Sequence, residues 1–582
     1  MSQERMKILE LLSEGTITVE ETSRLLEAIG DGDTTEPEKT STPDGPDRAA
    51  RRRRSNRRRR SNRMDWGEFS GEFEDLSSEI QDRVNHARET LRASMPKVKE
   101  AINEAMPDVD RIVREATASI PDVGRIVRET IRSATETFTD RPGDGIDLGY
   151  AETAEREVNK LLVIEPGSRV ALRNPRGSVK IETIEKNEIQ IEAKISVQAK
   201  SSDAAQSMAE LIKVEVIQDP NVVRVDARIP EQNERPDGVG PCRVDFIVKV
   251  PRKIDLDLRS AHGNIEAPEI EGAIVLRSRH GNTNLGGASG NVWVDQSHGM
   301  IQVDHVGTDL KLDSAHGHVN VGDITGAATL KTRHGNLTVG NVGRNAEIAI
   351  GHGELNIGSI GEDAVIDGSH GSISLGSVSG KLAVKVKHGL LTVGSVLKGA
   401  HATNRHGPVS IEKVGEDLVV QNHHGPIYAG SVGGDATVKT SHAGIDLKKV
   451  SGGVAAENDH GSITLDEIAG PIAVRSRWGS IEVSNSANQI AVQNEGGVIT
   501  IHPGDAVKSD YTIQNRRGSV NITLPEDSSV DVQGHVKQGR IHTELPLEVK
   551  GTSRNSHSVI GQLNGGGARI TVDVEGGNLS IT

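Results

Sequence analysis

A histidine recurs every 18 residues through the centre of this chain. Gly follows it in every case but one, where Ala443 stands instead. The next two positions in register are Trp478 and Gly496. The members of this histidine column are His262, His280, His298, His316, His334, His352, His370, His388, His406, His424, His442 and His460. So short a unit cannot bury an apolar face alone and must stack on its neighbours, which predicts a solenoid.

Apolar residues keep the same period. They stand three, five, eight and fourteen positions after the histidine, as in Ile301, Val303, Val306 and Leu312. Short alternating runs broken by Gly are typical of strands separated by corners. We therefore predict a mainly β fold, a parallel β-solenoid (β-helix) whose 18-residue coils stack about 4.8 Å apart. Eighteen extended residues give a perimeter near ~60 Å, enough for about three short sides per coil.

The histidine column is accompanied by a small polar row two positions earlier. Its members are Ser278, Ser314, Thr332, Asn404, Asn422, Thr440, Asn458 and Ser476. Alternate residues of a strand face the same side, and counting in steps of two from the apolar positions places the histidines on the interior side. We therefore expect a structural ladder of neutral imidazoles that are hydrogen-bonded to one another inside the corner. The alternatives are a metal-binding column, although no carboxylate or Cys recurs beside it, and a pH-responsive one. We predict no metal site and no cofactor.

The remaining segments differ in character from the repeat. Residues 150–258 alternate apolar and polar residues, which indicates antiparallel strands, with a helix expected at 202–213. The predicted division is a helical hairpin at 1–30, a disordered linker with an arginine run at 31–63, a helical segment with PDVxRIVRE repeats at 64–140, a β-rich entry domain at 150–258, the solenoid at 259–510, and its continuation and cap at 511–582.

Two N-terminal features indicate partners. The helices of 4–30 are too short to bury much surface, so we expect Leu9, Leu12, Leu25 and Leu26 to mediate self-association or bind another protein. The arginine run attracts polyanions. We favour an anionic membrane surface over nucleic acid, because no aromatic residue lies among the arginines to stack on bases. The alternative is an ordinary solvated linker. Its members are Arg51, Arg52, Arg53, Arg54, Arg57, Arg58, Arg59, Arg60 and Arg63.

Composition bears on location and on catalysis. No secretory signal and no stretch of about 18 apolar residues is visible, so we expect a cytoplasmic protein that associates with a membrane surface. The single cysteine, Cys242, excludes an intramolecular disulfide. β-Helical enzymes that act on polysaccharides need a cleft with clustered charged residues and aromatic side chains on which sugar rings stack. This chain has only 3 Trp to provide such aromatic surfaces. We therefore expect no enzymatic activity and no small-molecule substrate.

The layout resembles the bacterial putative-adhesin, β-strand-repeat family of YvlB/LiaX type, whose domain has no assigned function. ERMKILELLSEGTITVEETSRLLEAIG is similar to the family's SHOCT-like helical domain, and 170–250 with PRKIDLDL to its β-rich entry. The resemblance implies a link to cell-envelope stress or surface interaction and no catalytic residues. Histidine replaces the family's usual small residue. The main hypothesis is a non-catalytic scaffold; the alternatives are an extracellular adhesin and a β-helical polysaccharide-active enzyme.

Overall fold

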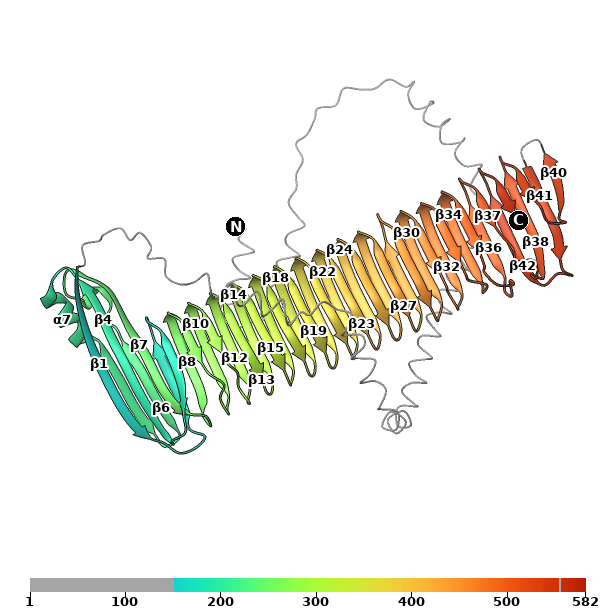
Figure 1. Cartoon of the computed structure of the whole chain (residues 1–582). Coiled ribbons are helices and arrows are strands. Elements are labelled where there is room, and N and C mark those ends of the chain that lie inside the picture. The colour runs from blue at the N-terminus through green and yellow to red at the C-terminus, as the bar shows by residue number, and fades with distance from the viewer. Residues whose placement is uncertain (1–150, 554–555) are drawn as a thin grey trace, which may run out of the picture. The chain divides into compact units, whose positions relative to one another are not determined.

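Stacked strands make up 64% of residues 151–553 and 556–582, which a computed structural model describes (Figure 1). The predicted parallel β-solenoid is confirmed, with about 15 turns of roughly 18 residues. The hairpin at 1–30, the arginine run at 51–63 and the repeats at 64–140 lie outside the described residues. Among the described helices, none is long and apolar enough to cross a membrane.

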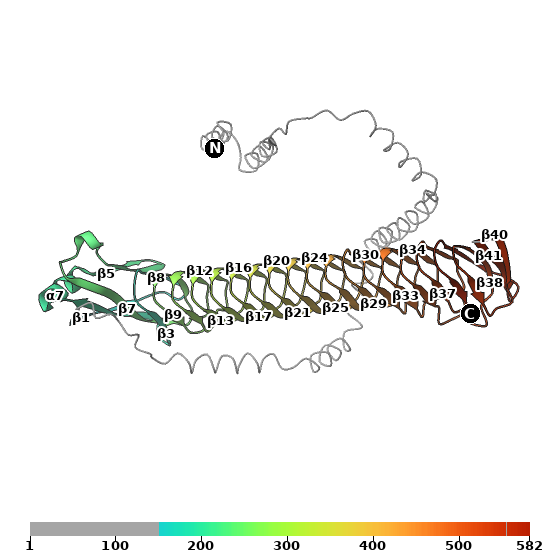
Figure 2. The same ribbon diagram turned by 90° about the horizontal axis from the view of Figure 1, so that it is seen from above.

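Each coil contributes one strand to each of two parallel sheets, seen stacked from above in Figure 2. The histidine sheet contains β8 (Asp255–His262), β10 (Ile274–His280), β12 (Val292–His298), β14 (Leu310–His316), β16 (Ala328–His334), β18 (Ala346–His352), β20 (Ala364–His370), β22 (Leu382–His388), β24 (Ala400–His406), β26 (Leu418–His424), β28 (Ala436–Thr440), β30 (Val454–His460), β32 (Ile472–Trp478), β34 (Ile490–Gly496) and β36 (Tyr511–Asn515).

The opposite sheet contains β9 (Ile265–Ala267), β11 (Thr283–Leu285), β13 (Ile301–Val306), β15 (Val319–Ile324), β17 (Leu337–Val342), β19 (Leu355–Ile360), β21 (Ile373–Val378), β23 (Leu391–Val396), β25 (Val409–Val414), β27 (Ile427–Val432), β29 (Ile445–Val450), β31 (Ile463–Asp466), β33 (Ile481–Ser484), β35 (Ile499–His502) and β37 (Val520–Ile522). Each coil thus contains two strands. In this sheet the pairing skips one residue, as between Val303 and His305.

The register repeats without drift in the histidine sheet, because the period equals one coil. His280 pairs with His298, and Leu276 pairs with Val294. The predicted apolar columns all face the interior, where Ile301, Val306 and Leu312 are no more than 1% exposed. Burying each such side chain contributes about 1.5–3 kcal/mol, and identical neighbours above and below let every coil use the same packing.

Antiparallel strands cover both ends of the stack. At the N-terminal end the elements are β1 (Glu152–Val163), β2 (Arg169–Asn174), β3 (Val179–Ile184), β4 (Glu188–Ala199), α7 (Ser202–Leu211), β5 (Lys213–Asp219), β6 (Val222–Arg228) and β7 (Val239–Pro251). As predicted, β1 pairs antiparallel with β4, β4 with β7 and β5 with β6. α7 matches the helix expected at 202–213. Such pairing protects the sheet edges that an open solenoid would expose.

Within the entry domain, however, β2 and β3 are parallel solenoid strands. β2 lies between β6 and β8, and β3 lies between β7 and β9, so later segments close over the first coil. The other end repeats this arrangement with β38 (Val530–Lys537), β39 (Ile541–Thr543), β40 (Glu548–Ser553), β41 (Ser556–Leu563), β42 (Ala568–Val574) and β43 (Leu579–Ile581). There β42 enters between β36 and β38, and β43 between β37 and β39.

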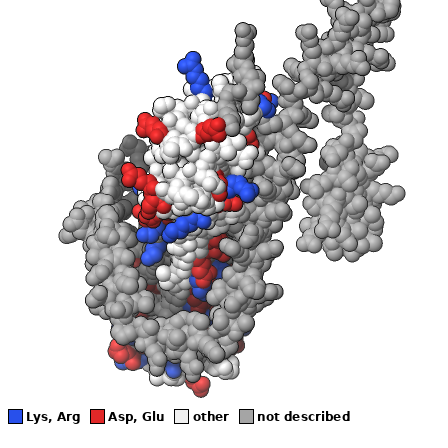
Figure 3. All heavy atoms as spheres, turned by 90° about the vertical axis from the view of Figure 1, so that its right-hand side faces the viewer, with Lys and Arg blue, Asp and Glu red and all other residues white. Residues whose placement is uncertain are grey.

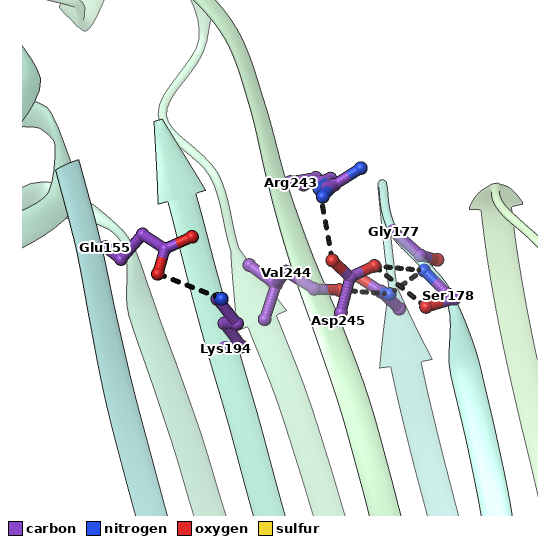
Figure 4. Close-up of polar contacts among 8 residues, drawn as sticks. Glu155, Gly177, Ser178, Lys194, Arg243, Val244 and Asp245 are labelled. Carbon is purple, nitrogen blue, oxygen red and sulfur yellow. Dashed lines mark hydrogen bonds and ion pairs between the residues drawn. The ribbon is translucent and has the colours of Figure 1, made fainter. Parts of the chain in front are cut away.

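Polar contacts join the first coil to the entry strands (Figure 4). Asp245 Oδ1 of β7 accepts hydrogen bonds from the backbone N and the hydroxyl of Ser178, both at 2.8 Å. Arg243 Nε lies 3.1 Å from Asp245 Oδ2, and Lys194 Nζ lies 2.9 Å from Glu155 Oε2. The Lys194–Glu155 pair joins β4 to β1, whereas Arg243 and Asp245 lie on the same strand, β7. Exposed ion pairs of this kind contribute about 0–1 kcal/mol each.

Candidate functional site: the histidine column

The histidines of the column lie at the outer edge of the solenoid, and the predicted inward ladder is wrong. All are exposed except the half-buried His406. Along each strand, buried and exposed side chains alternate until the residue before the histidine, which faces outward. The histidine should then face inward, but it faces outward as well. The glycine that follows the histidine, as at Gly281 and Gly335, then turns the chain with φ of 130° and 127°. Parity counted along a strand does not continue through such a corner.

The polar row two positions earlier fills the inside of the corner instead. Asn404 Nδ2 donates to the carbonyls of Gly389 and Gly407, each at 3.0 Å. Asn422 Nδ2 does the same with Gly407 and Gly425, each at 2.9 Å. These amides join successive corners across coils and satisfy buried carbonyls that would otherwise cost about 1–3 kcal/mol each.

The imidazoles form one continuous stack along the edge. Ring centroids of successive members lie 4.6–5.4 Å apart with interplanar angles of 3–17°. Trp478 follows His460 in the ladder, over Gly496, and the Arg517 guanidinium lies 5.2 Å from the Trp478 ring centroid. Side-by-side stacking was part of the sequence hypothesis, and it holds on the solvent side of the corner.

Stacking changes the titration of the column. The pKa values of His262, His316, His370, His406 and His424 are lowered from 6.5, first by loss of hydration and then by repulsion from neighbouring protonated rings. Arg279, Arg333, Lys387 and Arg405 add positive charge beside the column and lower the pKa values further. These five lowered pKa values favour the neutral imidazole, which has one nitrogen donor and one nitrogen acceptor.

We expect acid to destabilise the solenoid through this column. Because the folded-state pKa values lie below the unfolded value of about 6.5, the unfolded chain binds more protons as pH falls below that value. The melting temperature should therefore be lower at pH 5 than at pH 7.5, and less so in high salt, because exposed charges are screened. Thermal melts at both pH values and two salt concentrations measure this.

Replacing alternate histidines, His280, His316, His352 and His388, with Gln provides the matched variant. Each substitution removes a like-charged neighbour from two remaining rings, so the pH dependence of the melting temperature should flatten. An unchanged pH dependence in this variant would show that the column does not cause the acid sensitivity.

One further histidine joins the column where the structure brings three imidazoles together. His423 precedes His424, and their ring centroids are 4.3 Å apart. The ligand atoms of His423, His424 and His442 all lie within 4.8 Å of one another at the surface. The sequence analysis predicted no metal site and did not single out His423. The adjacent pair His423–His424 was the available signal, since the residue before the column histidine is not a histidine in any other coil.

Charge shows no comparable concentration at the end of the solenoid. Figure 3 shows acidic and basic side chains side by side among uncharged residues on the face that it displays.

Comparison with known proteins identifies one short domain. Residues 3–34 match the family described as SHOCT-like domain, which confirms the predicted resemblance of the N-terminal segment. No curated protein matches the chain. Because the family match covers only this segment, it concerns the N-terminal domain and not the solenoid.

Several solved structures match this chain at low identity and low TM-score. A "putative cell adhesion protein" from Clostridium sporogenes is 8% identical, with 73% of this chain and 99% of that chain covered and a TM-score of 0.13. A "putative adhesin" from Parabacteroides distasonis is 10% identical, with 47% and 97% covered and a TM-score of 0.21. A "putative lipid binding protein" from the same species is 9% identical, with 56% and 98% covered and a TM-score of 0.14. Similarity at this level carries no inference about what this chain binds.

Proposed function

We propose that this chain is a non-catalytic interaction scaffold. In this proposal the solenoid displays a repeated surface, the N-terminal SHOCT-like segment mediates association, and the arginine run attaches the chain to an anionic membrane surface in the cytoplasm. The observation that carries the proposal is the column of identical exposed imidazoles, held 4.6–5.4 Å apart by an in-register parallel ladder.

The internal packing supports a display role. The coils are filled by Val, Ile, Leu and Ala, so each coil fixes the position of the side chains on its outer surface. A repeat architecture of this kind offers the same chemical group many times at a constant spacing, which favours multivalent binding over the assembly of one reactive centre.

Attachment to the anionic surface is tested with the full chain and lipid vesicles. Sedimentation with vesicles of phosphatidylserine and phosphatidylcholine should show binding that weakens with salt. Replacing the nine arginines of 51–63 with Ser should weaken binding at least 100-fold, since each basic residue near such a surface contributes about 1 kcal/mol.

Replacing the same nine arginines with Lys is the control, because it keeps the charge. This variant should still bind the vesicles. Equal vesicle binding by the Ser and Lys variants would contradict the proposal, as would a chain that binds duplex DNA but not anionic vesicles.

A further inference from the structure

Three imidazoles meet at one corner of the histidine column, and we propose that they bind a divalent transition-metal ion such as Zn²⁺. The residues are His423, His424 and His442, whose ligand nitrogens lie within 4.8 Å of one another. All three side chains are exposed, so an ion reaches them from solvent without a change in the fold.

The chemistry of the donors selects the class of metal. Neutral imidazole nitrogen is a preferred ligand of Zn²⁺, Cu²⁺ and Ni²⁺, whereas Mg²⁺ and Ca²⁺ require oxygen ligands. Three histidines leave a fourth tetrahedral position for water. With metal–nitrogen distances of about 2.1 Å, tetrahedral ligand nitrogens lie roughly 3.4 Å apart. The three rings are stacked with interplanar angles of 11–23°, so binding requires these exposed side chains to rotate until their nitrogen lone pairs point at one ion.

The backbone at this corner departs from the repeat in a way that gathers the three rings. Elsewhere the corner glycine donates to the histidine carbonyl of the next coil, as Gly407 N does to His424 O at 2.8 Å. Here Ala443 replaces glycine, β28 ends at Thr440, and His442 N donates to His423 O at 3.2 Å. The stack consequently opens to 5.4 Å between His442 and His460, while His442 stays 4.7 Å from His424.

The adjoining residues hold His423 and His424 in place. Asn422 Oδ1 accepts from His423 N at 2.8 Å, and Asn422 Nδ2 is bound to two corner carbonyls. Arg405 opposes a cation here, but its side chain is exposed and salt screens it.

Titration of the chelator-treated full chain with Zn²⁺ at pH 7.5, followed by calorimetry, tests the site. One site should bind at least 10-fold more tightly than any other sites on the column. The variant His423→Ser should lose this tight site, because it removes one of the three ligands. Ser is chosen because Ser297 and Ser369 occupy the same position, before the column histidine, in other coils. Co²⁺ absorption bands of the wild-type protein should indicate tetrahedral nitrogen coordination and disappear in the variant. Mg²⁺ should produce no binding heat.

The matched control is His370→Ser. It removes one exposed column imidazole from a coil that has no second histidine beside it, since Ser369 stands where His423 stands at the proposed site. This variant should keep the tight site, and circular dichroism melts without metal should be the same for both variants. Equal loss of binding in the two variants would overturn the proposal in favour of binding along the whole column. A wild-type chain without a tight Zn²⁺ site would overturn it outright.

Discussion

Gly335→Ala should destabilise the solenoid by about 3 kcal/mol or more. Gly335 has φ of +127°, where residues with a Cβ are strained by about 1–3 kcal/mol. The added Cβ would lie only 1.9 Å from the carbonyl oxygen of Gly317 in the previous coil. Relief of this overlap requires the two coils to separate, which strains the hydrogen bond from Gly317 N to His334 O at 3.1 Å. Guanidinium unfolding followed by circular dichroism measures the loss.

Gly399→Ala is the control for this substitution. Gly399 also belongs to the repeats, but the nearest atom to its added Cβ would be Asp417 O at an ordinary 3.4 Å, and its φ lies outside the strained range. The change in the free energy of unfolding should therefore stay within about 1 kcal/mol. Similar losses in the two variants would contradict the close approach of successive corners at Gly335.

Leu355→Asp should destabilise the solenoid at least as much as Gly335→Ala, because it places a carboxylate in the apolar interior. Leu355 is fully buried and pairs with Leu337 and Ile373 in the adjoining coils. Replacing a buried Leu costs about 2–5 kcal/mol for lost packing. The carboxylate adds several kcal/mol of desolvation, which the protein reduces only by binding a proton. We expect a lower guanidinium midpoint and a loss of hydrogen-exchange protection centred on β17, β19 and β21.

Asn356→Asp provides the control one residue away. Asn356 is exposed on the other face of β19. The free energy of unfolding of the Asn356→Asp variant should therefore differ from that of the wild-type protein by less than about 0.5 kcal/mol. Coils far from the substitution, such as those of β32 and β34, should keep their protection in Leu355→Asp, because solenoid coils contact only their neighbours. Uniform loss of protection along the whole solenoid would contradict this nearest-neighbour cooperativity.

The period of the repeat was sufficient to predict the fold of the central region. The interval between histidines specifies the length of a coil, and apolar residues such as Ile301 and Leu312 recur in the columns that the structure buries. The helix at 202–213 and the antiparallel entry strands were also predictable, since each depends on local pattern. The N-terminal similarity to SHOCT-like domains was identified from its own sequence.

Sequence alone determined that this chain stacks 18-residue coils in register, because an apolar column at constant spacing is buried only in a stack. Tertiary structure alone decided which way the histidines face, since Gly281 and its equivalents turn the chain at the point where strand parity ends. It also decided that β2 and β42 enter between strands that are remote in the sequence, which depends on closing both ends. The meeting of His423 with His442 is likewise a consequence of corner geometry, because an 18-residue period records the positions of residues and not the path of the backbone between coils.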